Sequence, residues 1–563
     1  MFQNHYLLHC LLYFLPIFYQ NLNAEVPPHV CDPLVNTRHG QVQGFCTRVG
    51  ERMVRTFLGI PYAAPPVGPL RFQHPKPLKV TWNNTYHSVR LGPTCPEPLL
   101  GNDASRCDRP VTRNEDCLYL NIWSPASTDV AKGGKRKPVI VWIHGGGLIM
   151  LSGNDCKING GKIAAAIGDF VVVSVNFRQG ILGFSYSGTH HFPGNQGLMD
   201  IVMAVDWVYD NIQAFGGDQR RIALAGLSSG GFAAGWVWLS GLTGNKTQGL
   251  MLHSGGPGDP LCETTSQSME RFAIVAKNVG CINSKNPNAD PFSPEILKCV
   301  REAPMPMLLM AQTLPNNRVP ANRPEVVLPT LVEPVLASSL KEVWKRERWP
   351  KNKWIYVSTV TDEGHIMRPH MGGATFLKHS DMIDTIKAVG PKMFRPNQVE
   401  SGTQDLIKTY AIGYENATAT EMEVGFRDLI GDWYIRCPLI YFSKRMAETN
   451  KVYASKFTYT KKIGPIAETY GSRHGVDVYF FFGGPFRDAI GFTDLDRQTS
   501  AFMINVWSDF LNYGKSIWPP YQRTSNGRVI FLQREIDFRK EIRKTVHDAD
   551  ACRCEMWYKY YDI

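Results

Sequence analysis

RIALAGLSSGGF, residues 221–232, joins an apolar run to a turn that holds two serines and three glycines. Residues 226–230 match the pattern G-x-S-x-G, in which a serine stands on a sharp turn between a buried strand and a helix. The glycines let strand and helix pack closely, and the strained turn raises one hydroxyl above the sheet. The register selects Ser228, because a pattern centred on Ser229 would need glycine in place of Leu227. In isolation, the same pattern is also typical of a turn that serves packing alone.

Apolar runs elsewhere in the chain indicate a parallel sheet. Residues 138–143 (PVIVWI), 170–175 (FVVVSV) and 354–360 (WIYVSTV) lack polar alternation, as do strands that are buried on both faces. Residues 197–211 (GLMDIVMAVDWVYDN) repeat apolar side chains every three or four positions, which indicates a helix. Strands that alternate with helices predict an α/β fold with a central, mostly parallel, twisted sheet and helices on both faces.

A serine hydroxyl becomes a good nucleophile only when a base takes its proton and an acid orients the base. In sheets of this kind the acid follows the serine along the chain, and the histidine comes last. Asp362, Glu363 and Gly364 directly follow the strand predicted at 354–360, and His474 precedes an aromatic run. Because the chain has 15 histidines, position alone does not single out His474.

The first predicted strand is followed directly by His144, Gly145, Gly146 and Gly147. These residues have the composition of an oxyanion-binding loop. Glycines let backbone N–H groups approach a substrate oxygen without an intervening Cβ. We expect the backbone N–H groups of Gly146, Gly147 and Ser229 to form the oxyanion hole. His144 precedes the serine, so we expect it to support the loop and not to act as the base.

The composition is that of a globular protein: the 563 residues are 43% hydrophobic and 20% charged. The formal charge of +11 comes from scattered residues, with basic clusters at 132–137 and 341–353 that we interpret as solvated surface. No basic face with interleaved aromatic residues indicates nucleic-acid binding. No linker or repeat divides the chain, so we expect a single domain over residues 25–563.

Three features indicate export from the cell. Residues 1–24 hold an apolar stretch that ends in polar residues and Ala24, which predicts a cleaved signal peptide, with an uncleaved anchor as the alternative. Sequons predict N-glycosylation at Asn83, Asn245 and Asn416. Of the 13 cysteines only Cys10 lies in the signal, and the even remainder indicates disulfides. The sequence predicts neither a metal site nor an organic cofactor.

Four further segments match motifs of one known family: FLGIPYAAPPVGPLRF (57–72), EDCLYLNIWSP (115–125), GNQGLMD (194–200) and NIQAFGGD (211–218). Together they resemble the type-B carboxylesterases, the cholinesterase-like group of the α/β-hydrolase superfamily. The resemblance spans almost all of the mature chain and implies an α/β-hydrolase fold and the hydrolysis of carboxylic esters. It also identifies a catalytic triad of Ser228, Glu363 and His474.

The resemblance implies disulfides and ion pairs as well. The implied disulfides are Cys95–Cys117, Cys281–Cys299 and Cys437–Cys554, with Cys552 as an alternative partner for Cys437. The sequence does not choose how the other cysteines pair: Cys31, Cys46, Cys107, Cys156, Cys262 and Cys552. The implied ion pairs, Arg71 with Glu115 and Arg178 with Asp200, are supports of the fold.

The chain departs from cholinesterases around the expected site. Cholinesterases place a tryptophan in the first disulfide loop, where its ring attracts a quaternary ammonium, but residues 95–117 hold no aromatic residue. Leu148 and Leu227 stand where that group usually has phenylalanine and glutamate, and Leu261 stands where it has a tryptophan of the acyl pocket. We therefore expect neutral or apolar esters, and not choline esters, as the substrates.

Two functions remain possible at this point. We predict a secreted serine esterase that hydrolyses small-molecule carboxylic esters through an acyl-enzyme. The alternative, which Leu227 motivates, is a binding or adhesion protein that retains an unused triad, although such relatives usually lose a triad residue. The sequence predicts no stable membrane span, and it does not indicate the oligomeric state.

Overall fold

A computed structural model is the basis for the structural description of the protein. It describes residues 31, 33–98, 112–126, 135–155, 161–258, 262–314, 328–366, 376–459, 472–488, 491–516, 519–523, 529–530, 532–536, 545–547 and 549–561. For residues 522–552 within these ranges, only the backbone is described. The predicted signal peptide lies outside the described residues.

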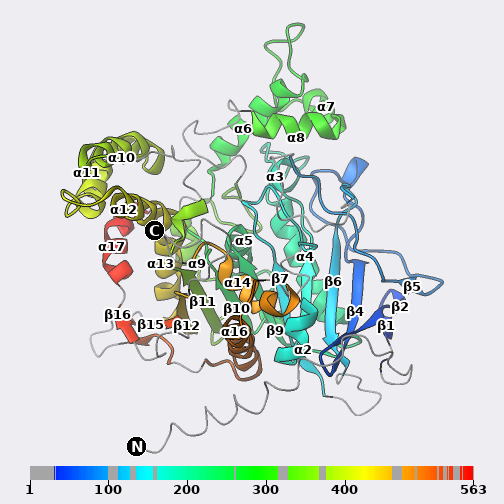
Figure 1. The fold of residues 1–563 in the computed structure, drawn as a ribbon. Coiled ribbons are helices and arrows are strands. Elements are labelled where there is room, and N and C mark those ends of the chain that lie inside the picture. The colour runs from blue at the N-terminus through cyan, green and yellow to red at the C-terminus, as the bar shows by residue number, and fades with distance from the viewer. Residues whose placement is uncertain are drawn as a thin grey trace, which may run out of the picture.

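An eleven-stranded sheet forms the centre of the fold (Figure 1), with the strand order β16-β15-β12-β11-β10-β9-β7-β8-β6-β4-β3. The strands from β15 to β8 in this order are parallel, and β16 at one edge and β6, β4 and β3 at the other pair antiparallel. The strands span Phe45–Val49 (β3), Arg52–Pro61 (β4), Tyr119–Pro125 (β6), Lys137–Ile143 (β7), Val171–Val175 (β8), Gly217–Leu227 (β9), Gly249–His253 (β10), Trp354–Val360 (β11), Lys451–Phe457 (β12), Leu532–Ile536 (β15) and Thr545–His547 (β16).

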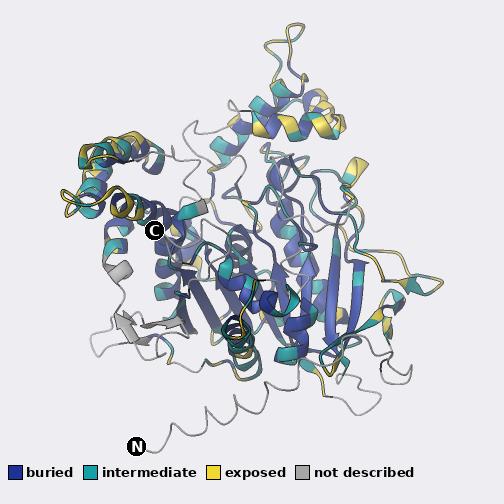
Figure 2. Cartoon of the chain, viewed as in Figure 1, coloured by how far each residue is buried: buried dark blue, intermediate teal, exposed yellow. Residues whose placement is uncertain are grey.

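Both faces of the central strands are buried, which explains why their sequences lack polar alternation (Figure 2). In β7, Val139 and Val141 join one hydrophobic core, and Ile140 and Trp142 join a second core on the opposite face. Successive side chains of a strand point to opposite faces, so each face needs its own cover of helices. The predicted mostly parallel sheet with helices on both faces is confirmed.

Helices from distant parts of the chain cover the two faces. The first core includes side chains of α4 (Gln196–Asn211), α5 (Ser229–Ser240), α12 (Ala419–Gly431) and α13 (Cys437–Met446). The second core includes side chains of α2 (Gly161–Gly168), α14 (Val476–Phe481) and α16 (Asp494–Tyr513). The helix predicted at 197–211 is α4, and the strands predicted at 138–143, 170–175 and 354–360 are β7, β8 and β11.

Two groups of helices lie beyond the sheet in Figure 1, one at the top and one at the left. Both groups carry many of the exposed residues, which are yellow in Figure 2. The upper group contains α6 (Thr265–Asn278), α7 (Pro294–Glu302) and α8 (Met305–Thr313). The left group contains α10 (His379–Met393), α11 (Val399–Tyr410), α12 and α17 (Ala549–Tyr558).

The remaining elements are short. They are β1 (Leu34–Thr37), β2 (Gly40–Gln43), β5 (Tyr86–His87), β13 (Gln522–Arg523), β14 (Val529–Ile530), α3 (Gly180–Phe184), α9 (Leu340–Arg346), α15 (Gly484–Arg487), the 3-10 turns η1 (Gly68–Leu70), η5 (Gly244–Lys246), η7 (Gly364–Ile366) and η9 (Pro396–Gln398), and the π-helix η10 (Asp432–Arg436). Within the described part of the chain, every helix is too short or too polar to span a membrane.

Among the described residues, the structure contains the three disulfides that the resemblance implies and one more, between Cys31 and Cys46. The side chain of Cys262 is buried. Cys107, Cys156 and the side chain of Cys552 lie outside the described residues.

The two ion pairs that the resemblance implies are also present. Arg178 binds Asp200 through two contacts, with Nε 2.8 Å from Oδ2 and Nη2 2.7 Å from Oδ1. Arg71 contacts Glu115 in the same two-point manner, with Nε 2.6 Å from Oε2. The pairs join residues that are 44 and 22 positions apart, as expected of supports of the fold.

Candidate active site

Ser228 stands at the turn between the central strand β9 and helix α5. Its backbone has φ 55° and ψ −127°, a conformation that costs free energy for a residue with a Cβ. The turn is held because the N–H of Ser228 donates to the carbonyl of His253, which ends the neighbouring strand β10, at 2.8 Å. The N-terminus of α5 follows at once, and its free N–H groups favour negative charge near the Ser228 side chain.

The glycines around Ser228 are required by space. A Cβ at Gly226 would lie 2.4 Å from the carbonyl oxygen of Gly230, and one at Gly230 would lie 2.3 Å from the carbonyl oxygen of His144. A Cβ at Gly255, after the neighbouring strand, would lie 2.1 Å from the carbonyl oxygen of Ser228. The backbone therefore passes so close at these three glycines that no side chain fits there, which keeps the turn at Ser228 tight.

Glu363 and His474 contact each other although 111 residues separate them. Oε2 of Glu363 lies 2.7 Å from Nδ1 of His474, and both side chains are buried, with 0% and 5% exposure. The other carboxylate oxygen of Glu363 accepts the N–H of Val360 at 2.8 Å, which anchors the carboxylate to the end of β11. Nε2 of His474 is buried and has no hydrogen-bond partner among the described residues.

The loop that carries His474 lies beside the turn that carries Ser228. A Cβ at Gly475 would lie 3.3 Å from Cδ2 of Leu227, so the residue before Ser228 contacts the residue after His474. Leu227 is half-buried in this contact and packs on the second core. The structure thus brings together Glu363 with His474, and the His474 loop with the Ser228 turn.

The glycine-rich loop after β7 also faces Ser228. A Cβ at Gly145 would lie 3.2 Å from the Cβ of Ser228. Gly146 and Gly147 adopt φ values of 110° and 66°, which favour glycine. The N–H of Leu148 donates to Oγ of Ser229 at 3.1 Å, which fixes this loop to the first turn of α5.

Two residues that the sequence did not single out hold the far end of this loop. Oε2 of Glu97 accepts the N–H of Leu151 at 2.7 Å, and Oε1 of Glu97 accepts from Nη2 of Arg113 at 2.8 Å. Nε2 of Gln179 donates to the carbonyl of Leu151 at 2.7 Å. Because Glu97 lies two residues after Cys95, the first disulfide loop is joined directly to the glycine-rich loop.

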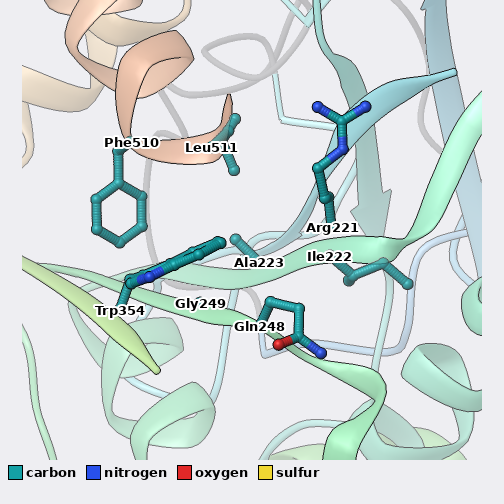
Figure 3. Close-up of a pocket in the computed structure, with 8 residues that line it drawn as sticks. All are labelled: Arg221, Ile222, Ala223, Gln248, Gly249, Trp354, Phe510 and Leu511. Carbon is teal, nitrogen blue, oxygen red and sulfur yellow. The ribbon is translucent and has the colours of Figure 1, made fainter. Parts of the chain in front are cut away.

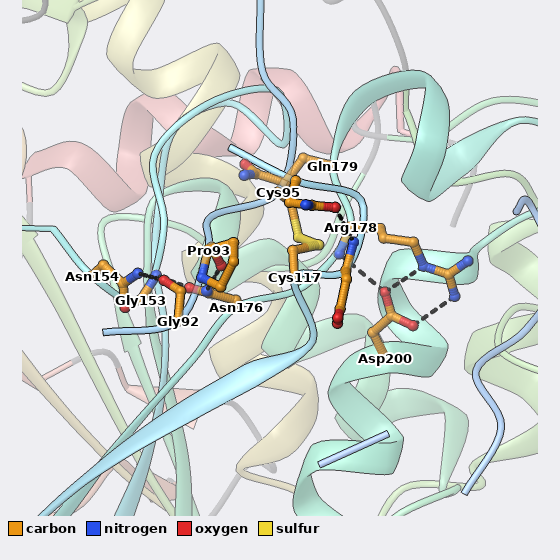
Figure 4. Close-up of a disulfide and its surroundings, with 12 residues drawn as sticks. Gly92, Pro93, Cys95, Cys117, Gly153, Asn154, Asn176, Arg178, Gln179 and Asp200 are labelled. Carbon is orange, nitrogen blue, oxygen red and sulfur yellow. Dashed lines mark hydrogen bonds and ion pairs between the residues drawn. A yellow bond between two sulfur atoms is a disulfide. The ribbon is translucent and has the colours of Figure 1, made fainter. Parts of the chain in front are cut away.

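The segments around the Cys95–Cys117 disulfide are joined by side-chain amides (Figure 4). Asn176 donates to the carbonyl of Pro93 at 3.0 Å and accepts the N–H of Gly153 at 2.9 Å. Nδ2 of Asn154 donates to the carbonyl of Gly92 at 2.9 Å. These bonds cross-link the disulfide to the end of the glycine-rich loop, so the loop has little freedom to shift.

His144 is a buried part of the loop. Its Nδ1 lies 2.8 Å from the carbonyl oxygen of Gly145, and its ring stacks on Phe177 with 4.7 Å between centroids. Burial lowers the pKa of His144 to about 4, so the imidazole is neutral near pH 7. These contacts are those of a supporting residue, in line with the expectation from the sequence.

Of the leucines that replace the usual polar or aromatic residues, two are described. Leu148 is buried, with 2% exposure, and Leu227 is half-buried beside the His474 loop. Leu261 and residues 99–111 of the disulfide loop lie outside the described residues. The described surroundings of Ser228 are therefore aliphatic at both positions.

A small depression lies at the end of the sheet that is opposite to Ser228 (Figure 3). Arg221, Gln248, Trp354 and Phe510 line it, and it is too narrow to admit a water molecule. Arg221 is six residues before the end of β9, whereas Ser228 follows that end. The depression is thus separated from Ser228 by the length of the strands, and we assign it no part in the chemistry.

The three sequon asparagines, Asn83, Asn245 and Asn416, are exposed. Asn245 lies within η5, after α5, and Asn416 precedes α12. Each is open to modification, which leaves glycosylation as a prediction.

A mostly parallel sheet with a strained serine between a central strand and the next helix defines the α/β-hydrolase class. The chain belongs to the Carboxylesterase family, whose sequence profile matches residues 31–550. It is therefore a carboxylic ester hydrolase that acts on small-molecule esters.

Several cholinesterases are similar to this chain over most of their length. Acetylcholinesterase-1 of Trittame loki is 29% identical, over 96% of this chain and 97% of its own. The cholinesterase of Mus musculus is 28% identical, over 99% of this chain and 90% of its own. The acetylcholinesterase of Bungarus fasciatus is 27% identical, over 88% of this chain and 82% of its own.

Proposed function

We propose that the protein is a secreted serine esterase in which Ser228 is the nucleophile, His474 the base and Glu363 the orienting acid. The observation that carries the proposal is the 2.7 Å contact between Glu363 Oε2 and His474 Nδ1, with His474 Nε2 left without a described partner. A carboxylate on Nδ1 keeps the proton on that nitrogen, and Nε2 is then free to accept a proton.

These three roles define the proposed reaction. Nε2 of His474 takes the proton of Ser228 as the Ser228 oxygen attacks the ester carbonyl. The tetrahedral intermediate collapses when His474 returns the proton to the leaving alcohol, which leaves an acyl-enzyme on Ser228. Water then attacks the acyl group with the same proton transfers, and the carboxylic acid departs. Glu363 stabilises the imidazolium that forms in each half of the cycle.

The N–H groups of Gly146, Gly147 and Ser229 are the proposed donors to the oxyanion. Gly145 lies against Ser228, and the N–H of Leu148 donates to the Ser229 hydroxyl, so the loop and the start of α5 lie together beside Ser228. Donors held before the reaction lose no entropy at the transition state. The bonds from Glu97 and Gln179 to Leu151 support this arrangement.

We propose neutral or apolar esters as the substrates. Leu227 and Leu148 provide aliphatic walls, and the first disulfide loop has no aromatic residue that could attract a quaternary ammonium. The similar proteins are named cholinesterases, so a choline ester is the alternative substrate.

A matched pair of esters tests this preference. Acetylcholine and 3,3-dimethylbutyl acetate differ only in the replacement of the quaternary nitrogen by carbon. We expect kcat/KM to be about tenfold higher for the neutral ester, since no cation–π contact repays the desolvation of the charge. Titration of the released acid in a pH-stat measures both substrates in the same way. Equal or faster hydrolysis of acetylcholine would contradict the proposal.

We also propose that residues 25–563 form one secreted domain. The four disulfides support an oxidising compartment, and Asn83, Asn245 and Asn416 are exposed. N-terminal sequencing of protein secreted from eukaryotic cells is expected to begin at Glu25, and a glycosidase is expected to lower its mass. Recovery of the chain only in membranes, with its first 24 residues intact, would favour the uncleaved anchor.

A further inference from the structure

The turn that carries Glu363 lies directly against two consecutive helices, α12 and η10. A Cβ at Gly364 would lie 1.9 Å from the carbonyl oxygen of Arg427 in α12. A Cβ at Gly431, at the end of α12, would lie 3.1 Å from the Cβ of Glu363. The backbones therefore touch without intervening side chains, and a shift of these helices would move Glu363.

Two buried arginines of these helices hold the residues just before Glu363. Nε of Arg427 lies 3.5 Å from Oδ1 of Asp362, and Nη2 of Arg436 donates to the carbonyl of Thr361 at 3.2 Å. The two arginine side chains are only 3% and 2% exposed. Arg427 lies at ion-pair distance and Arg436 at hydrogen-bond distance, so both contacts favour one position of the turn that carries Glu363.

The arginines are in turn held by carboxylates. Arg427 lies 3.5 Å from Glu423, and Arg436 contacts Asp432 at the start of the π-helix and Asp428 at 3.4 Å. Asp432 also binds Arg553 of α17 at 2.7 Å. The cluster therefore extends from the acid turn to the C-terminal helix, which the Cys437–Cys554 disulfide ties down beside η10.

Asp362 joins the acid turn to the loop of the base as well. Its N–H donates to the carbonyl of Ser472 at 2.8 Å, and it forms a parallel bridge with Arg473. His474 is the next residue. Asp362 thus contacts α12 through its side chain and the His474 loop through its backbone, from the position next to Glu363.

The charge of Asp362 weakens the fold at neutral pH. Burial is the largest cause that raises the pKa of Asp362 from 3.8 to about 6; Asp428 and Glu363 raise it further, and Arg427 and Arg436 lower it. Because the folded state binds the proton more tightly than the unfolded chain, stability falls as pH rises from about 4 to 6. A buried carboxylate that lowers the stability of the fold at neutral pH, as Asp362 does beside Glu363, is typical of a functional position.

We propose that Asp362, paired with Arg427, is a positioning residue. It holds the turn that carries Glu363 beside the loop that carries His474, so that the Glu363 carboxylate contacts the His474 imidazole. The inference rests on the proposed triad. Asp362 acts through Glu363 and His474 and does not contact the substrate. Arg436 supports the same turn through the carbonyl of Thr361.

Asp362→Asn tests the proposal, because asparagine keeps the shape and removes the charge. We expect kcat for a p-nitrophenyl ester to fall at least tenfold, with KM within twofold and with a thermal midpoint at pH 7.5 that is unchanged or higher. A residue with a purely structural role would lower the thermal midpoint instead. Native kcat in Asp362→Asn, or a loss of kcat that follows a lowered thermal midpoint, would overturn the inference.

A double-mutant cycle with Arg427→Met tests the pair. We expect Arg427→Met to lower kcat as Asp362→Asn does, and the double variant to be no worse than either single variant. Additive losses would overturn the pairing. The control is Arg271→Met, since Arg271 is a buried arginine paired with Glu263 at the start of α6. It should lower the thermal midpoint and leave kcat unchanged; an equal loss of kcat would mean that any buried pair acts this way and would overturn the inference.

The proposed triad and the proposed positioning role of Asp362 can be tested separately. If the unchanged protein neither hydrolyses esters nor reacts with a fluorophosphonate at Ser228, the proposed triad is wrong. If the unchanged protein is active and the Asp362 and Arg427 variants keep its kcat, only the positioning role is wrong.

Discussion

Ser228→Ala is expected to lower kcat for ester hydrolysis by about 10⁵- to 10⁶-fold, because no other group can form the acyl-enzyme. Alanine keeps the Cβ, so the strained backbone at φ 55° is as costly as before and the fold should persist. A fluorophosphonate probe should label the unchanged protein at Ser228 and leave the variant unlabelled, as mass spectrometry of the labelled peptide would establish.

Ser254 offers a matched control for Ser228. It is a buried serine at φ 48° that follows the neighbouring strand β10, so Ser254→Ala removes a hydroxyl from similar backbone. Activity and labelling should survive this change. Residual hydrolysis in Ser228→Ala comparable to that of the unchanged protein would refute the assignment of the nucleophile and indicate that another group attacks the ester.

Glu363→Gln is expected to lower kcat by about 10⁴-fold with little effect on KM. The amide can present an N–H to Nδ1 of His474, which stabilises the tautomer with the proton on Nε2. That nitrogen then cannot accept the proton of Ser228. Steady-state kinetics on a p-nitrophenyl ester, with circular dichroism to verify folding, would measure the effect.

The control for Glu363→Gln is Glu263→Gln, which alters another buried glutamate with a charged partner, Arg271. We expect a lower thermal midpoint with kcat preserved. A Glu363 variant that keeps more than a tenth of native kcat would mean that another group orients His474.

The sequence was most informative where structure depends on neighbouring residues. The turn at Ser228 could be predicted because three of its constraints, a buried strand, small neighbours and a following helix, lie within twelve residues. The strands β7, β8 and β11 were predicted for the same reason, since burial on both faces leaves a local apolar signal. Glu363 and His474 were different. The predicted strand at 354–360 placed an acid after its end, but only the resemblance to a family selected Glu363 and His474.

The supports of the site were not predictable in this way. Glu97 binds the N–H of Leu151, 54 residues further along the chain, and Asp362 meets Arg427 on a helix 65 positions later. Buried charges and backbone contacts of this kind leave no local pattern, because their partners are brought together only when the sheet, the disulfides and the outer helices pack.

Local spacing in the chain was sufficient to predict the type of sheet, the strained serine and the glycine-rich loop, because sterics and periodicity act over a few residues. The approach of Glu363 to His474, and the carboxylates and guanidiniums that hold both of their loops, depend on packing across the whole fold. Such contacts form between segments that the chain itself keeps far apart, so their geometry exists only once the core is assembled.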